Sequence, residues 1–119
     1  MKFSVNQQDL QKSLGYCQGV IEKRSTLPIL SNVLLDASNS KLKIIATDLD
    51  LIFVNQIPNI KIFEEGKTTT SSSIMFDVVR KIPSGSQINF LNSGESKLQL
   101  ESNKSLFNLN SIDASEFPI

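Results

Sequence analysis

An internal repeat constrains the fold of this chain more than any other feature. Residues 30–44 and 87–100 each contain an imperfectly alternating apolar run, a small polar cluster and a second alternating run. Within them, residues 40–44 (SKLKI) and 96–100 (SKLQL) match almost residue for residue at a separation of 56 positions. Alternation with a period of two on both sides of a short polar turn predicts a β-hairpin. The same hairpin is therefore expected twice.

The surroundings of the two hairpins extend the repeat. An apolar-rich strand is expected after each hairpin, at Leu49–Ile57 and at Leu106–Ile112, and a short strand followed by a helix is expected before each. The repeats then span approximately residues 1–58 and 66–112, each with the order β-α-β-β-β. Adjacent strands joined by short turns favour antiparallel pairing. The sequence thus predicts an α+β fold with two helices packed on one side of antiparallel sheets.

The first helix is expected over Gln7–Ile21, with Asn6 as its N-terminal cap. One face of this helix is apolar, with Leu10, Leu14, Cys17 and Ile21 at helical spacing. Lys12 falls on the opposite face. The stripe should pack against the sheet, which would bury the Cys17 thiol and leave it inert.

The second helix is expected over Ser73–Ile82, because Pro83 and Gly85 follow it. Its apolar face would consist of Met75, Val78, Val79 and Ile82. Six consecutive hydroxyl residues at 68–73 suit a strand that runs directly into a helix cap.

Composition narrows the class of protein. A chain of 119 residues, of which 39% are hydrophobic, suits one domain that folds without a disulfide or a metal. A single cysteine and no histidine exclude a disulfide framework, the common zinc sites and the usual general base. We therefore expect a protein that is not an enzyme and has no metal and no cofactor. Without an apolar stretch long enough to span a bilayer or a secretory signal, cytoplasmic residence is expected.

The formal net charge is zero, which argues against nucleic-acid binding by bulk charge and leaves open a single basic surface. Asp48 and Asp50 lie two positions apart and allow two interpretations. They could face one side of a strand and bind a divalent cation, or they could form a hairpin turn. No further carboxylates lie at ligand spacing, so the turn is favoured.

Six short blocks occur in order along the chain: MKF at 1–3, RSTLPIL at 24–30, ATDL at 46–49, GKTT at 66–69, FDVVRKIP at 76–83 and EFP at 116–118. Together they resemble the N-terminal domain of the bacterial DNA polymerase III beta subunit, the beta sliding clamp. The resemblance covers residues 1–119 and is specific because six blocks agree in register. It implies a fold built from a tandem βαβββ unit, which the repeat predicts independently.

The resemblance also implies a function. In that family, three-domain subunits form a head-to-tail homodimer ring around double-stranded DNA, with sheets outside and helices lining the hole. Such a ring is a DNA polymerase processivity factor that tethers the replicative polymerase. Peptide motifs of the polymerase and the clamp loader bind in the later domains, so this chain is expected to lack that pocket. The alternative is a protein-interaction module with the same duplicated fold and no DNA role.

A protein that slides on duplex should contact phosphates through solvated polar groups and leave the base edges unread. Candidates for DNA binding are Arg24, Lys12, Lys23, Ser73, Arg80 and Lys81. Arg24 is the first choice because it belongs to a matching block. Ser73 stands where clamps often carry a basic residue, so one phosphate contact is expected to be weaker here. Each basic candidate could instead be an ordinary solvated surface charge.

A subunit interface is the second implied surface. The second helix carries an apolar strip along one flank, and two apolar residues of the last strand share a face. The resulting interface candidates are Ile74, Val78, Ile82, Phe107 and Leu109. The competing interpretation is that these residues belong to the core.

Overall fold

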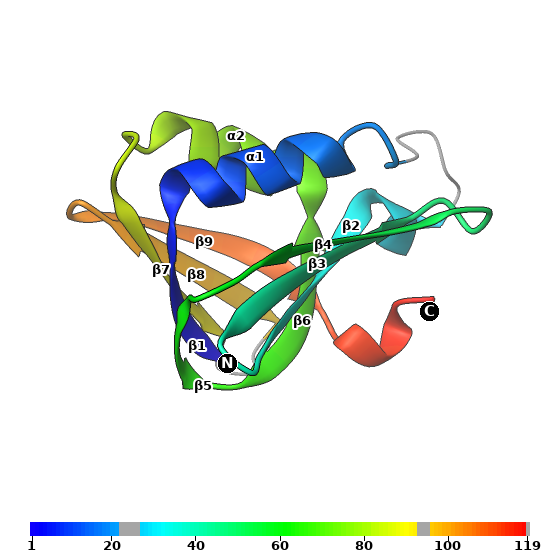
Figure 1. Ribbon diagram of the computed structural model, residues 1–119. Helices are drawn as coiled ribbons and strands as arrows, with labels where there is room; N and C mark the ends of the chain where they lie inside the picture. The colour runs from blue at the N-terminus through cyan, green and yellow to red at the C-terminus, as the bar shows by residue number, and fades with distance from the viewer. Residues whose placement is uncertain (22–26, 93–95, 119) are drawn as a thin grey trace.

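Two helices lie side by side on one face of an antiparallel sheet in the computed structural model, which describes residues 1–21, 27–92 and 96–118 (Figure 1). Within these ranges nine strands are joined in the order β4-β3-β2-β6-β9-β8-β7-β1-β5. The strands are β1 (Lys2–Asn6), β2 (Asn32–Ser38), β3 (Lys41–Thr47), β4 (Ile52–Ile57), β5 (Lys61–Glu64), β6 (Gly66–Ser71), β7 (Gln87–Asn92), β8 (Lys97–Ser102) and β9 (Ser105–Ile112). The expected α+β fold is confirmed.

The order of elements is β1-α1-β2-β3-β4 and then β6-α2-β7-β8-β9, with β5 between the two runs. Short 3₁₀ turns occur at Pro28–Ser31 and Ala114–Glu116. Strand β5 was not expected from the sequence. It has four residues, and only Ile62 turns partly inward, opposite Phe3 of β1. A segment this short gives no readable alternation.

Helix α1 (Gln7–Cys17) begins where the sequence predicts and ends earlier. The Asn6 carboxamide oxygen accepts hydrogen bonds from the backbone N–H groups of Gln8 and Asp9 at 2.9 and 3.3 Å. The predicted end at Ile21 is wrong, because the chain tightens into turns after Cys17, with the Val20 N–H donating to the Cys17 carbonyl at 2.9 Å. Gly19 in this segment disfavours a further helical turn.

Helix α2 (Ser72–Lys81) is displaced by one residue from its predicted bounds. The Ser71 hydroxyl accepts a hydrogen bond from the Ile74 N–H at 3.3 Å, so the hydroxyl run does pass from a strand into a helix cap. Ile82 is extended rather than helical, at φ −85° and ψ 133°. Pro83 explains this, because a proline disfavours the helical conformation of the residue before it.

Two-residue turns close the hairpins β2–β3 and β8–β9. Asn39 and Ser40 have φ values of 52° and 62°, and Asn103 and Lys104 have φ values of 51° and 71°. Positive φ at both central residues matches the twist of the paired strands.

Strand β4 begins at Ile52, three residues after the predicted start at Leu49. Leu49 has a φ of 81°. The Asp48 carboxylate accepts hydrogen bonds from the N–H groups of Asp50 and Leu51 at 3.0 and 2.8 Å. These bonds form a turn, which supports the turn interpretation of Asp48 and Asp50 over the cation site.

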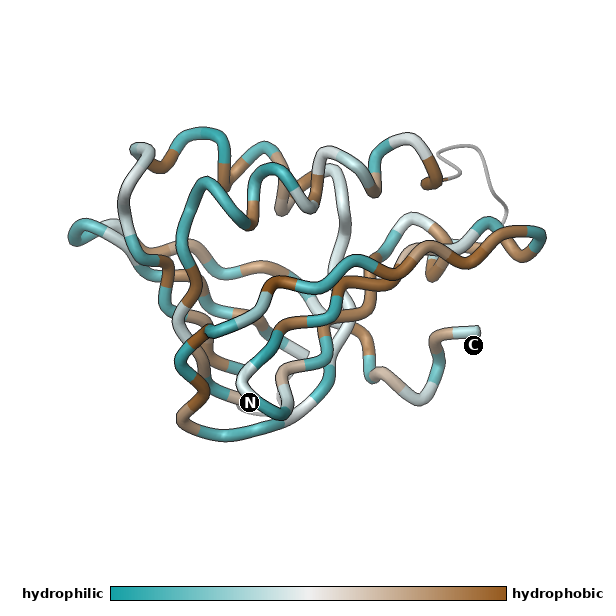
Figure 2. Tube along the Cα trace, viewed as in Figure 1, coloured by the Kyte–Doolittle hydropathy of each residue, from teal (hydrophilic) through white to brown (hydrophobic). Residues whose placement is uncertain are grey.

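The core lies between the helices and the sheet. Figure 2 shows hydrophilic segments along the outer side of the helices and hydrophobic ones where they turn toward the strands. The predicted stripe of α1 is buried, and on α2 Met75 and Val79 are fully enclosed while Val78 is half-buried. Phe3 and Phe90 stack across β1 and β7 with ring centroids 4.6 Å apart.

Candidate nucleic-acid interface

The helix pair is fixed at both ends by hydrogen bonds. The Gln7 amide at the start of α1 donates to the Val79 carbonyl near the end of α2 at 2.9 Å. The Ser72 hydroxyl at the start of α2 donates to the Gln18 amide oxygen just after α1 at 3.1 Å. The helices therefore run antiparallel, and their outer faces form one surface of fixed geometry.

Three of the predicted DNA contacts, Lys12, Arg80 and Lys81, are exposed on these two helices. Among the described residues, Lys12 and Lys81 have no carboxylate within ion-pair distance. Arg80 is less free, because its guanidinium lies 2.7 Å from the Asp77 carboxylate.

Of the other three candidates for DNA binding, Ser73 is the one that lies within the described residues. Ser73 is half-buried in the first turn of α2, so its hydroxyl is less available than a lysine side chain would be. Lys23 and Arg24 lie outside the described residues. Their expected phosphate contacts remain predictions.

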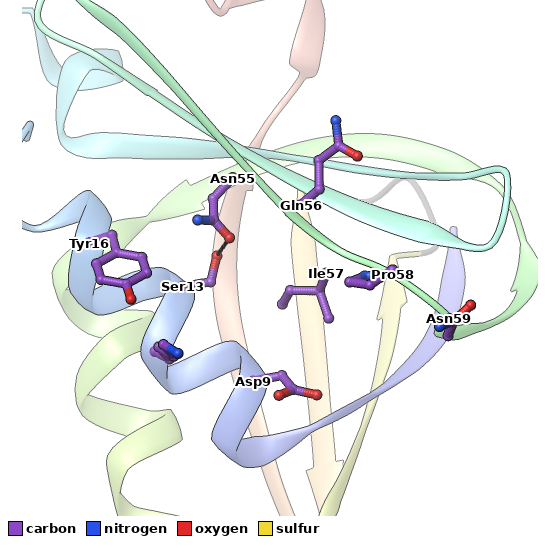
Figure 3. A pocket seen from close by; sticks show the side chains of 9 residues that line it. Asp9, Ser13, Tyr16, Asn55, Gln56, Ile57, Pro58 and Asn59 are labelled. Atoms are coloured by element: carbon purple, nitrogen blue, oxygen red, sulfur yellow. Dashed lines mark hydrogen bonds between the residues drawn. The ribbon is translucent and has the colours of Figure 1, made fainter.

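A groove of about 580 Å³ separates α1 from β4 and the turn that follows it (Figure 3). The Ser13 hydroxyl closes part of it by donating to the Asn55 amide oxygen at 2.7 Å. The other lining residues are Asp9, Lys12, Tyr16, Gln56, Ile57, Pro58 and Asn59. The groove thus offers hydrogen-bond donors, hydrogen-bond acceptors and one lysine.

A second groove, of about 500 Å³, lies between α1 and α2. Tyr16 and Phe76 supply its aromatic surface, and Gln8, Gln11, Lys12 and Gly15 complete it. The sequence interpretation missed both aromatic residues. One feature of the sequence could have indicated Tyr16: it follows Lys12 by four residues, so the two side chains are neighbours on the outer face of a helix.

The predicted interface residues gather beside β9. A groove of about 410 Å³ is lined by Ile74 and Val78 of α2 together with residues 106–110 of β9, including Phe107 and Leu109. Ile82 does not line it, and both Ile82 and Leu109 are almost completely buried in the core. Leu106, which the sequence interpretation missed, is exposed in this groove.

Strand β9 has an open edge next to this groove. Its Ser111 and Ile112 pair with β6 and its Asn110 carbonyl accepts a hydrogen bond from the Thr70 hydroxyl of β6, whereas residues 105–109 pair with β8 alone in the described part of the chain. A strand edge with free N–H and C=O groups is a template for pairing with another chain.

Burial raises the pKa of the Cys17 thiol to about 12, so the thiol stays protonated and unreactive at neutral pH. In the described ranges, no group of three or more histidine, cysteine, aspartate or glutamate residues is placed to hold a metal ion. Neither described helix has the length and apolarity needed to cross a membrane.

Comparison with known proteins gives the affiliation of the chain. The family model described as DNA polymerase III beta subunit, N-terminal domain, matches residues 1–119. The beta sliding clamp of Caulobacter vibrioides strain NA1000 is 36% identical over 120 residues, which cover 100% of this chain and 32% of that protein. The Vibrio harveyi beta sliding clamp is also 36% identical, over 99% of this chain and 81% of the relative.

Comparison with solved structures gives the same affiliation. A crystal structure of the C. crescentus beta sliding clamp superposes with a TM-score of 0.95 at 36% identity, covering all of this chain and 32% of the clamp. The beta subunit from Pseudomonas aeruginosa gives a TM-score of 0.93 at 31% identity, with the same 32% coverage. The chain thus spans about a third of the length of most of these relatives. With a family model matched from end to end and the same fold, this chain belongs to the family of DNA polymerase III beta subunit N-terminal domains.

Proposed function

We propose that this chain is the first domain of a sliding clamp, a ring-shaped dimer that encircles duplex DNA and tethers the replicative polymerase as a processivity factor. The helix pair would face the DNA and the sheet would form the outer wall of the ring. The observation that carries the proposal is the outer surface of α1 and α2, where exposed Lys12 and Lys81 project from a hydrogen-bonded, hydrophilic scaffold.

Such a surface suits sliding. Lysine side chains attract phosphates through solvated, sequence-independent contacts, which can be exchanged as the protein moves along the duplex. The ring would therefore retain DNA by topology, and its interior would supply only modest attraction.

Ring closure would use the open edge of β9 and the groove beside it. Exposed Ile74 and Leu106 and half-buried Val78 and Phe107 offer an apolar surface next to free backbone groups. We propose that the third domain of a second subunit docks here and continues the sheet across the interface.

The polymerase and the clamp loader would bind through later domains of the subunit, and the domain itself would catalyse nothing. Action on chromosomal DNA would place the protein in the cytoplasm.

The test uses the product of the complete native reading frame, loaded by its clamp loader onto nicked circular DNA and gel-filtered at high salt. Retention on circles and loss after the DNA is linearised is expected. Equal retention on both forms would indicate ordinary affinity binding and contradict the clamp. Absence of retention on either form, with an active loader, would favour the interaction module.

A further inference from the structure

The groove between α1 and α2 differs in chemistry from the surface around it. Among the six described residues that line it, Lys12 is the one with a charge, and none of the six is a carboxylate. Tyr16 and Phe76 give it an aromatic surface that contact with duplex phosphates does not require. An aromatic surface beside a cation on the proposed DNA-facing side therefore calls for a separate explanation.

The aromatic rings are accessible. Tyr16 is 52% exposed, a large fraction for a tyrosine in a helix that packs on a sheet. Phe76 is half-buried, and the position facing its ring edge is Gly15, where a Cβ atom would lie 3.8 Å from Phe76 Cε1. The glycine thus leaves space beside the ring that any other residue would occupy.

A cation lies beside each ring. The Arg80 guanidinium carbon lies 5.1 Å from the centroid of the Phe76 ring, within the range of a cation–π contact, although the guanidinium is also paired with the Asp77 carboxylate at 2.7 Å. Lys12 lines the groove one helical turn from Tyr16. Aromatic rings flanked by cations are the combination with which proteins bind single-stranded nucleic acid, because rings stack on bases and cations attract phosphates.

We propose that this groove binds single-stranded DNA by stacking an unpaired base on Tyr16, with Phe76 as the second apolar wall and Lys12 beside the backbone. The inference rests on the proposed function in one respect: the groove lies on the side that would face DNA in a ring. It would give the clamp domain a contact with unpaired template, in addition to its contacts with duplex.

The chain carries its own probe, because Tyr16 is its single tyrosine and it has no tryptophan. Base stacking should quench the tyrosine emission, after correction for absorption by DNA. The titrants are oligo(dT), an abasic oligonucleotide of the same length and backbone, and a hairpin duplex. We expect quenching by oligo(dT) and little by the other two.

Affinity is measured in parallel by anisotropy of labelled oligo(dT). Tyr16→Phe keeps the stacking surface and should bind as the parent does. Tyr16→Ala should weaken binding about fivefold to one-hundredfold, the range found when one stacked aromatic residue is truncated. The matched control is Phe63→Ala, because Phe63 on β5 is 59% exposed with the ammonium groups of Lys2 and Lys61 5.6 and 5.7 Å from its ring, and β5 lies away from the helices (Figure 1).

Three outcomes would overturn the inference: equal quenching by the abasic oligonucleotide, an equal loss of affinity in Tyr16→Ala and Phe63→Ala, or no quenching by oligo(dT). The last outcome would leave the groove to an apolar peptide or another occupant. The clamp proposal is judged separately by retention on circular DNA, which Tyr16→Ala should not abolish. Failure of one therefore remains distinguishable from failure of the other.

Discussion

The Thr70 hydroxyl on β6 donates a hydrogen bond of 2.8 Å to the backbone carbonyl oxygen of Asn110 on β9. The neighbouring Thr69 hydroxyl donates to the Ile112 carbonyl at the same distance. Strands β6 and β9 share a ladder of only two residue pairs in the described structure, Thr69 with Ile112 and Thr70 with Ser111. The two side-chain bonds therefore supplement the ladder at the place where the two halves of the sheet join.

Replacing Thr70 with valine should destabilise this junction. Valine keeps the shape of the side chain and removes the donor, so the expected loss is about 1–2 kcal/mol of unfolding free energy. Urea denaturation measures it. Asn110→Ala is the control, because it keeps the backbone acceptor and should change stability by less than about 0.5 kcal/mol. An equal effect of both substitutions would contradict a role for the hydroxyl bond.

Two glycines should respond to alanine in opposite directions. Gly15 lies inside α1, where an added Cβ would meet Phe76 at an ordinary contact distance of 3.8 Å. Gly15→Ala should therefore stabilise the chain by about 0.5–1 kcal/mol through its better helix propensity. At Gly66 the Cβ would lie 2.9 Å from Met1 Cβ and 3.3 Å from Met1 Cα. Gly66→Ala should destabilise by about 1–3 kcal/mol, and thermal unfolding of both variants provides the comparison.

Cys17 should make stability fall at alkaline pH. Its pKa rises from 9.0 to about 12 because burial disfavours the thiolate. Between these values the folded protein keeps a proton that the unfolded chain has lost, so the free energy of unfolding decreases by up to about 1.4 kcal/mol per pH unit.

Cys17→Ala should lower stability at pH 7 by leaving a small cavity, and it should also remove this part of the alkaline slope. Denaturation curves from pH 8 to pH 11 separate the two effects. If the native thiol reacted with a disulfide reagent as rapidly as the thiol of the unfolded chain, Cys17 would be accessible, and burial could not be the cause of its raised pKa.

Glu64 should contribute to stability at neutral pH and lose that contribution in acid. The Met1 ammonium donates to its carboxylate at 2.9 Å and lowers the pKa of Glu64 below 4.5. The contribution is present above the unfolded pKa and disappears as the pH falls through the folded pKa. Glu64→Gln should therefore be less stable than the parent at pH 7 and approach it at low pH. Denaturation curves at several pH values measure this, and a stability difference between the variant and the parent that stays the same at all pH values would refute the ion pair as the cause.

The charges on the helices should determine the salt dependence of duplex binding. Lys12→Gln and Lys81→Gln should each lower the magnitude of the slope of log K against log salt by about 0.9. Arg80→Gln should lower it less, because Asp77 already neutralises the guanidinium. Ser73→Lys should raise it by about 0.9, the contribution of one added phosphate contact. Anisotropy of labelled duplex over a salt series tests this ranking, which identical slopes for all four variants would refute.

The local secondary structure could be predicted from the sequence alone. The stripe Leu10, Leu14, Cys17 and Ile21 is buried, Asn6 caps α1, and both predicted hairpins pair as antiparallel strands. Periodicity and caps involve residues a few positions apart, so the sequence contains both partners of each interaction within one window. The six family blocks added the affiliation, because each of them appears in order along the chain.

Contacts between elements that are far apart in the sequence could not be predicted in this way. Gln7 and Val79 meet across 72 positions, and this contact sets the pairing of the helices that forms the groove of Tyr16 and Phe76. The sequence period places Ile82 on the same helical flank as Ile74, yet Ile82 is extended and buried just after α2, whereas Ile74 on the helix is 57% exposed. A sequence period fixes which way a side chain leaves its own helix, whereas burial depends on what the rest of the fold packs against that side. The grooves and the open edge of β9 follow from that packing.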